Sequence, residues 1–119
     1  MNINALDTAL KDLAKKRKEL ESLDYSNPKY DDLEEELHDL EDEFQDNYGE
    51  FMEGILQNVH KKYCPDSDVL LPIAYLGSGV LVEADDYPGK EVKLSLVYGP
   101  PRIILNVGKG GEEVVWKGE

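Results

Sequence analysis

The chain of 119 residues is acidic, with a formal net charge of −13 at pH 7, and it is 40% hydrophobic and 33% charged. This balance is typical of a folded protein with a heavily charged surface, and the length suits one compact domain. The negative charge disfavours direct binding to DNA or RNA, because nucleic-acid phosphates repel an acidic surface.

Three features of the sequence indicate in which cellular compartment the protein is located. No stretch reaches the roughly 18 apolar residues that a membrane span requires. The segment from Met1 to Lys16 lacks the apolar region of a secretory signal. Cys64 is the single cysteine, so an intrachain disulfide cannot form. Together these features predict a cytoplasmic protein that does not enter a membrane.

The first predicted element is an amphipathic helix over residues 3–23. Apolar side chains recur there at steps of three and four, at Ile3, Leu6, Leu10, Leu13 and Leu20. The sequence Ser26-Asn27-Pro28 then favours a turn. In this interpretation Ser26 or Asn27 caps the next helix, and Pro28 suits its first turn.

The second predicted helix covers residues 28–63. Its apolar stripe is formed by Tyr30, Leu33, Leu37, Leu40, Phe44, Tyr48, Phe51, Ile55, Val59 and Tyr63. A turn of about five residues between two such helices predicts an antiparallel hairpin, a short coiled coil, over residues 1–66. Gly49 and Gly54 lower the helix propensity, so we expect a kink or a break near them.

The stripe of the second helix widens beyond Gly49, which indicates two different packing partners. We expect Leu33, Leu37, Leu40 and Phe44 to contact the first helix. We expect Ile55, Leu56 and Val59 to contact a sheet, because a wider stripe needs a broader partner.

Residues 67–119 are predicted to form an antiparallel β-meander. The period changes to two, and the expected strands cover residues 69–76, 80–84, 91–98, 102–107 and 113–117. Short glycine- and proline-rich connections between successive strands favour antiparallel pairing. The predicted fold class is therefore α+β, with a helical hairpin packed on a meander of about five strands to form one compact domain.

The most unusual feature of the sequence is an acidic run from Asp31 to Glu53, which holds twelve carboxylates and no Lys or Arg. Helical spacing directs five of these carboxylates to water: Glu35, Glu36, Asp39, Asp42 and Glu43. Four of them, Glu35, Asp39, Asp42 and Glu43, are the candidate binding surface for a basic protein partner. The alternative is a solvated helix face without a binding role.

Metal and catalytic sites are not predicted. Glu35 and His38 have the spacing of a di-iron motif, but that site needs ligands from several helices. His60 and Cys64 could form half of a zinc site, yet the chain offers no nearby residues to complete it. We interpret both of these residues as structural, and we expect neither a cofactor nor enzymatic activity.

The sheet is expected to leave one face uncovered, because the end of one helix cannot cover both faces. If Val92, Leu94 and Leu96 face the helix, the opposite face carries Leu81, Val97 and Ile104. An exposed apolar patch often marks an interface, so these three residues predict a homodimer.

The predicted function is a non-catalytic protein–protein interaction module with an acidic helical arm. One alternative is a transcription-associated factor. A helical hairpin followed by a small β-domain is similar in layout to the bacterial transcript-cleavage factors of the Gre family. That resemblance implies that acidic residues at the hairpin tip, here Asp24, Asp31 and Asp32, support metal-dependent RNA cleavage. A second alternative is a small ligand-binding or enzymatic domain with a pocket between the second helix and the sheet.

Overall fold

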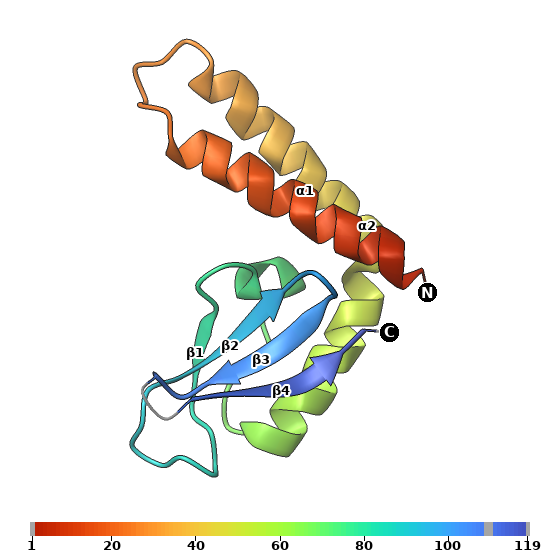
Figure 1. Ribbon diagram of the computed structural model, residues 1–119, viewed down its shortest axis with the longest axis vertical. Helices are drawn as coiled ribbons and strands as arrows, with labels where there is room; N and C mark the ends of the chain where they lie inside the picture. Colours follow the sequence, from red (N-terminus) through yellow and green to blue (C-terminus); the bar gives the residue numbers. More distant parts are fainter. Residues whose placement is uncertain (1, 109–110, 119) are drawn as a thin grey trace.

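The computed structural model describes residues 2–108 and 111–118. Two helices form a hairpin, and a four-stranded antiparallel sheet follows them in the chain. Figure 1 shows the hairpin as an arm that projects from a body in which the sheet lies against the second half of the second helix. The α+β class and the order of a helical hairpin before a meander are thus confirmed.

Helix α1 (Ile3–Glu21) is held at its start by a side-chain cap and along its length by burial of one face. The side chain of Asn2 accepts a hydrogen bond from the backbone N–H of Ala5 at 3.0 Å. This bond satisfies one of the N–H groups that have no partner within the helix. Leu6, Leu10 and Leu13 are buried, as the apolar stripe predicts.

The turn between the helices differs from the prediction. Helix α2 (Tyr30–Tyr63) begins two residues later than expected, and its N-cap position, Lys29, makes no side-chain capping bond. The Asn27 side chain instead accepts from the backbone N–H of Lys29 at 2.9 Å. Asn27 therefore stabilises the turn itself rather than the helix terminus, and Pro28 precedes the helix.

Helix α2 is unbroken over its 34 residues, so of the two expected alternatives a break near Gly49 or Gly54 is wrong. Figure 1 shows the helix axis changing direction between the part beside α1 and the part behind the sheet, as the alternative of a kink predicts. Gly49 is buried, and the side chain of Gln45 lies across it and donates to Glu53 at 3.0 Å.

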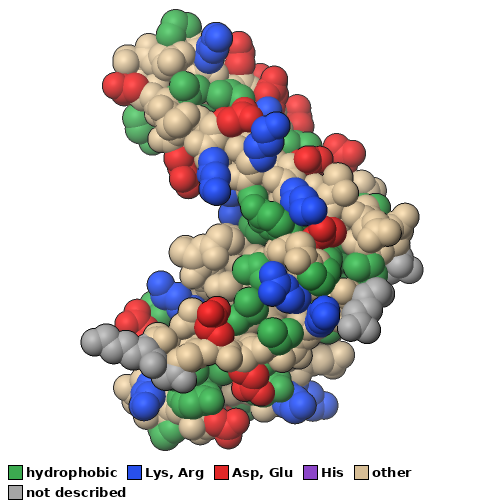
Figure 2. Space-filling view, viewed as in Figure 1, with side chains coloured by type: hydrophobic (Ala, Val, Ile, Leu, Met, Phe, Trp, Pro, Cys, Tyr) green, Lys and Arg blue, Asp and Glu red, His purple; other side chains and the backbone are tan. Residues whose placement is uncertain are grey.

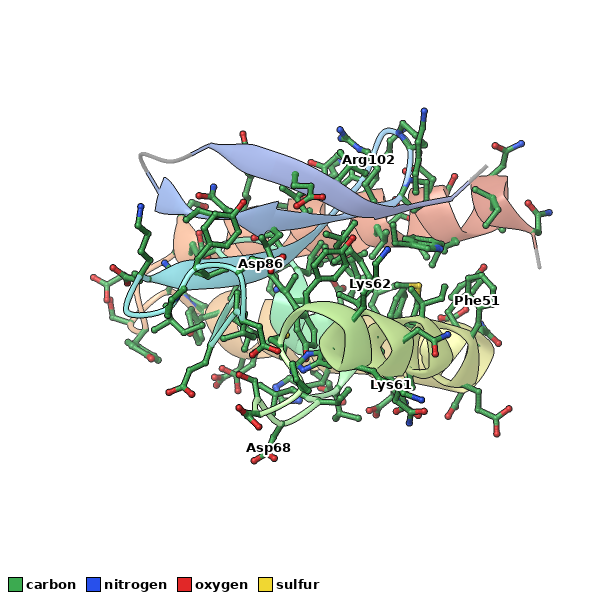
Figure 3. All side chains as sticks on the ribbon, turned by 90° about the horizontal axis from the view of Figure 1, so that it is seen from below. Phe51, Lys61, Lys62, Asp68, Asp86 and Arg102 are labelled. Carbon is green, nitrogen blue, oxygen red and sulfur yellow. The ribbon has the colours of Figure 1, made fainter. Side chains whose placement is uncertain are left out.

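The two halves of α2 bury different residues, in line with the widening stripe. In the half beside α1, Leu37 and Phe44 are buried. In the half that lies under the sheet, Met52, Leu56 and Val59 are buried, whereas Ile55 is only half-buried. Figure 3 shows this half of α2 on one side of the sheet and labels Phe51 on the helix. The Phe51 ring packs edge-on against Trp116, with ring centroids 6.3 Å apart.

The sheet contains four strands in the order β1 (Val80–Val82), β2 (Val92–Val97), β3 (Arg102–Asn106) and β4 (Glu112–Lys117). Each strand pairs antiparallel with the next one in the chain, which is the predicted meander. The register shifts between Ile103 and Ile104, so Val115 on β4 is an extra residue that has no partner on β3.

The strand expected over residues 69–76 is absent from the described residues, and the count of about five strands is corrected to four. A 3₁₀ turn, η1 (Pro72–Tyr75), lies there instead. Pro72 lacks a backbone N–H, which suits the first turn of a helix and interrupts a strand ladder. Leu70 and Leu71 are exposed, so the apolar run does not reflect a buried strand.

The sheet has a covered inner face and an uncovered outer face. Val92, Leu94 and Leu96 on β2 are buried against the core, and Lys93 and Ser95 point to the other side. This alternation confirms the predicted orientation of β2. Tyr98, the next position in the same alternation, follows the end of the strand and is exposed.

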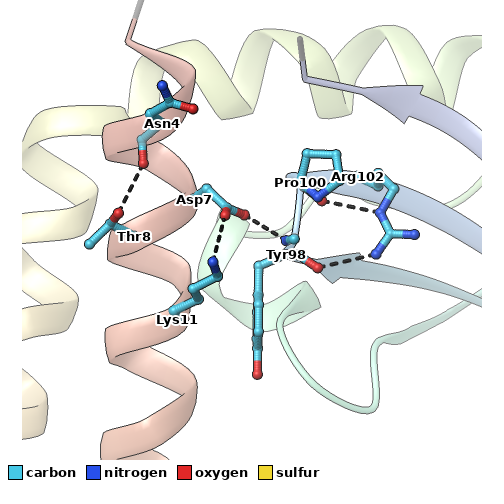
Figure 4. Close-up of polar contacts among 8 residues, drawn as sticks. Asn4, Asp7, Thr8, Lys11, Tyr98, Pro100 and Arg102 are labelled. Carbon is cyan, nitrogen blue, oxygen red and sulfur yellow. Dashed lines mark hydrogen bonds and ion pairs between the residues drawn. The ribbon is translucent and has the colours of Figure 1, made fainter.

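Polar contacts join the arm to the body at two places along α1. The Asp7 carboxylate accepts a hydrogen bond from the backbone N–H of Gly99, in the turn between β2 and β3, at 2.7 Å (Figure 4). Farther along the helix, the Arg17 guanidinium donates to the carbonyls of Ile73 and Leu76 at 3.2 and 3.1 Å. These contacts orient the arm relative to the sheet.

Candidate functional site

The acidic face of the arm is exposed as the helical spacing predicts. Glu35, Asp39, Asp42 and Glu43 are all exposed to solvent. They lie on the side of α2 opposite the buried Leu37 and Phe44 stripe. The structure thus brings the four candidate residues together on one helix face, and their role in binding remains a prediction.

Helix α1 neutralises only part of this charge. Lys16 pairs with Glu36 at 3.0 Å, and Arg17 pairs with Glu41 at 3.5 Å. The ion pairs between the helices within residues 2–108 and 111–118 are these two, and neither involves the four candidate carboxylates. The acidic face therefore keeps its negative field.

Acidic side chains gather along one edge of the arm surface. Figure 2 shows them along the upper right edge, whereas acidic and basic side chains are mixed on the rest of the visible arm. The acidic edge is accessible to a macromolecule that approaches the arm from outside.

The tip of the hairpin lies at the end of the arm away from the sheet (Figure 1). Asp24, Asp31 and Asp32 are exposed there, and the rings of Tyr25 and Tyr30 pack with their centroids 4.7 Å apart. In the described part of the chain, no group of three or more His, Cys, Asp or Glu side chains is arranged to hold a metal ion.

His60 lies in a buried polar network at the end of α2. Its Nδ1 is 3.0 Å from the carbonyl oxygen of Ser67, and its Nε2 is 2.8 Å from the hydroxyl of Tyr75. A carbonyl only accepts, so Nδ1 carries the proton and Tyr75 donates to Nε2 in the neutral imidazole. The Tyr75 hydroxyl also accepts from the N–H of Leu70 at 3.1 Å.

Because of this network, the imidazole of His60 is not available to interact with the Cys64 thiol. Both ring nitrogens have partners, so neither is directed at the thiol. Burial, and to a lesser degree the negative charge of Asp85, raises the pKa of the Cys64 thiol to about 11. A thiol with this pKa is protonated at neutral pH and is a poor nucleophile or metal ligand.

A cleft of about 550 Å³ lies between α1 and the sheet, where Figure 2 shows a deep notch on the left. Arg17 and Lys18 line it from the helix, and Leu76, Val97 and Tyr98 line it from the body. Between α2 and the sheet, the side chains of Met52, Leu56 and Val59 are buried in the core.

The strand register arranges the outer face of the sheet in three rows. The first row contains Leu81, Lys93, Asn106 and Glu112. The second row contains Ser95, Ile104 and Val114, and the third contains Val97, Arg102 and Lys117.

This arrangement separates the three predicted self-association residues. Val97 and Ile104 are diagonal neighbours, whereas Leu81 lies beyond Lys93 at a corner of the face. Val114 is the direct neighbour of Ile104 and is 52% exposed. The sequence prediction missed Val114, because Val114 and Val115 look equivalent until the bulge is known.

Comparisons with protein-family models, with curated proteins and with solved structures find no match for this chain. Among the described residues, no helix is long and apolar enough to cross a membrane.

Proposed function

We propose that this protein is a non-catalytic protein–protein interaction module whose acidic helical arm binds a basic protein partner. One observation carries the proposal: Glu35, Asp39, Asp42 and Glu43 are exposed on one face of α2, and no ion pair between described residues involves them. The arm holds this charged face away from the sheet.

The energetics of the acidic run favour a binding role over solubility alone. Like charges three or four residues apart on a helix repel each other by a few tenths of a kcal/mol per pair. A surface with mixed charges would keep the protein soluble at a lower cost in stability. The remaining negative field speeds encounter with a basic partner, and salt weakens it.

The absence of catalysis is part of the proposal and has support in the buried network. Both nitrogens of His60 make hydrogen bonds, and the raised pKa of Cys64 keeps its thiol neutral. Cys64 is buried as a free thiol, which suits the reducing cytoplasm where we place the interaction.

The test compares two variants that change the net charge equally. The arm variant carries Glu35→Gln, Asp39→Asn, Asp42→Asn and Glu43→Gln. The body variant neutralises four exposed carboxylates outside the arm, through Asp66→Asn, Asp68→Asn, Asp86→Asn and Glu91→Gln. Figure 3 labels Asp68 and Asp86 in the loops of the body.

Each tagged protein is used to capture partners from a lysate at low salt, and the bound proteins are identified by mass spectrometry. We expect the wild type and the body variant to retain the same basic proteins, and the arm variant to lose them while its circular dichroism spectrum is unchanged. Equal retention by all three proteins would show that the acidic run only hydrates the helix.

A further inference from the structure

We propose that the outer face of the sheet binds the outer face of a second copy of this chain, with a two-fold axis along β3. The face is uncovered in the single chain, because α2 lies against the other side of the sheet (Figure 3). A two-fold axis makes the interface isologous, so each contact must be satisfied by two residues of the same face.

The centre of the outer face is apolar. Ile104 on β3 is half-buried, and its cross-strand neighbour Val114 on β4 is 52% exposed. Val97 on β2 lies diagonally beside Ile104. An axis along β3 places Ile104 against Ile104 of the second copy, which removes this apolar group from water.

Two charges of the face, those of Lys93 and Glu112, are complementary to each other under the same axis. Lys93 on β2 and Glu112 on β4 belong to one row, on the two strands that flank β3. When two such sheets face each other, β2 of one copy lies opposite β4 of the other. Lys93 then meets Glu112 of the second copy, and the symmetry produces this pair twice.

Within one chain the same two residues do not form an ion pair with each other. They lie on strands that β3 separates, with backbones about 10 Å apart. The ion pairs among the described residues include neither of them. Pairing between copies therefore gives both charges a partner that the single chain does not offer.

Two other residues define the limits of the interface. Arg102 also lies on β3, but its guanidinium donates to the carbonyls of Tyr98 and Pro100, each at 3.1 Å, which holds it at the end of the sheet (Figure 4). Leu81 lies on β1, which has no strand opposite it when the axis runs along β3. Leu81 therefore falls outside the contact despite being 60% exposed.

The size of the face sets the strength of the association. The surface that each copy would bury, made of three strands and three rows of side chains, is smaller than the roughly 800 Å² per partner of a standard interface. The dimer should therefore be weak, with a dissociation constant in the micromolar range or above, and it should depend on protein concentration.

The first test measures the mass of the protein by sedimentation velocity over a concentration range from about 10 µM to about 1 mM, chosen to cover a weak interface. We expect the wild type to approach the dimer mass, Ile104→Ser to remain monomeric, and Leu81→Ser to associate like the wild type. A wild type that stays monomeric, or equal effects of the two serine variants, would overturn the proposal.

The second test exchanges the charges. Lys93→Glu and Glu112→Lys should each weaken the association by about tenfold or more, because each places like charges opposite one another. The double variant should recover it to within a few-fold. The two single variants move the net charge in opposite directions, so net charge cannot explain a loss in both. A double variant as weak as the single variants would refute the pairing.

Discussion

At the scale of single residues, Asp7 connects the arm to the body. The hydrogen bond from the Gly99 N–H holds the pKa of the Asp7 carboxyl below its usual value, and Lys11, 3.2 Å away, acts in the same direction. A lowered pKa in the folded state stabilises the fold above the ordinary value of 3.8. That contribution is lost as the pH falls through the lower folded value.

We expect Asp7→Ala to lower the free energy of unfolding at pH 7 by about 1 kcal/mol, since the Gly99 N–H loses its acceptor. The difference from the wild type should shrink as the pH falls below 3.8 and through the lower pKa of the folded state. Urea unfolding at pH 7 and over this acidic range measures this. Asp12→Ala, an exposed position on the same helix, is the control and should cost little at any of these pH values.

Tyr75 is the second residue whose role can be tested. Its hydroxyl donates to His60 Nε2 and accepts from the Leu70 N–H, and the side chain is fully buried. Tyr75→Phe leaves both of those groups without a partner, so we expect a loss of about 1–3 kcal/mol. The exposed Tyr98→Phe should change stability by much less in the same denaturant measurement. Equal effects would mean that the network does not hold the segment after α2 in place.

At the scale of the elements, α2 shows which features of the fold can be predicted from the sequence. The apolar stripe predicted one long helix with two packing partners, because burial follows the helical period over many turns. The bounds of the turn were predicted less well, since Asn27 had two competing roles that local sequence does not distinguish: capping the helix or stabilising the turn.

Two features of the β-rich half of the chain were not predicted correctly from the sequence: the segment over residues 69–76 and the bulge on β4. The run from Val69 to Leu76 resembles a strand in composition, but Pro72 and the exposed leucines place it in a loop and a 3₁₀ turn. The bulge at Val115 depends on long-range pairing with β3, and no local pattern reveals it. The orientation of β2 was predicted correctly, because its alternation extends over a full strand.

The two glycines of α2 give a prediction at this scale. A Cβ at Gly54 would meet no atom within 4 Å, so Gly54→Ala should stabilise the protein by about 0.5–1 kcal/mol through helix propensity. A Cβ at Gly49 would collide with the Gln45 side chain, which must then move and give up its bond to Glu53. Gly49→Ala should therefore gain less or lose stability, and urea unfolding of both variants checks the order.

At the scale of the whole molecule, the charged surface and the apolar surface lie on different parts of the fold. The acidic run lies on α2, mainly along the arm, and the uncovered apolar residues Ile104 and Val114 lie on the sheet. The sequence alone predicted the acidic face, because helical spacing fixes which side chains point outward. It could not predict which residues of the sheet are neighbours, since that requires the strand register.

We propose that the arm is the surface that meets a partner. Zero-length cross-linking of carboxylates to amines, applied to the captured complex and read by mass spectrometry, tests this proposal. We expect cross-links from lysines of the partner to Glu35, Asp39, Asp42 and Glu43. Cross-links confined to carboxylates of the body, such as Asp66, Asp68 and Asp86, would contradict it.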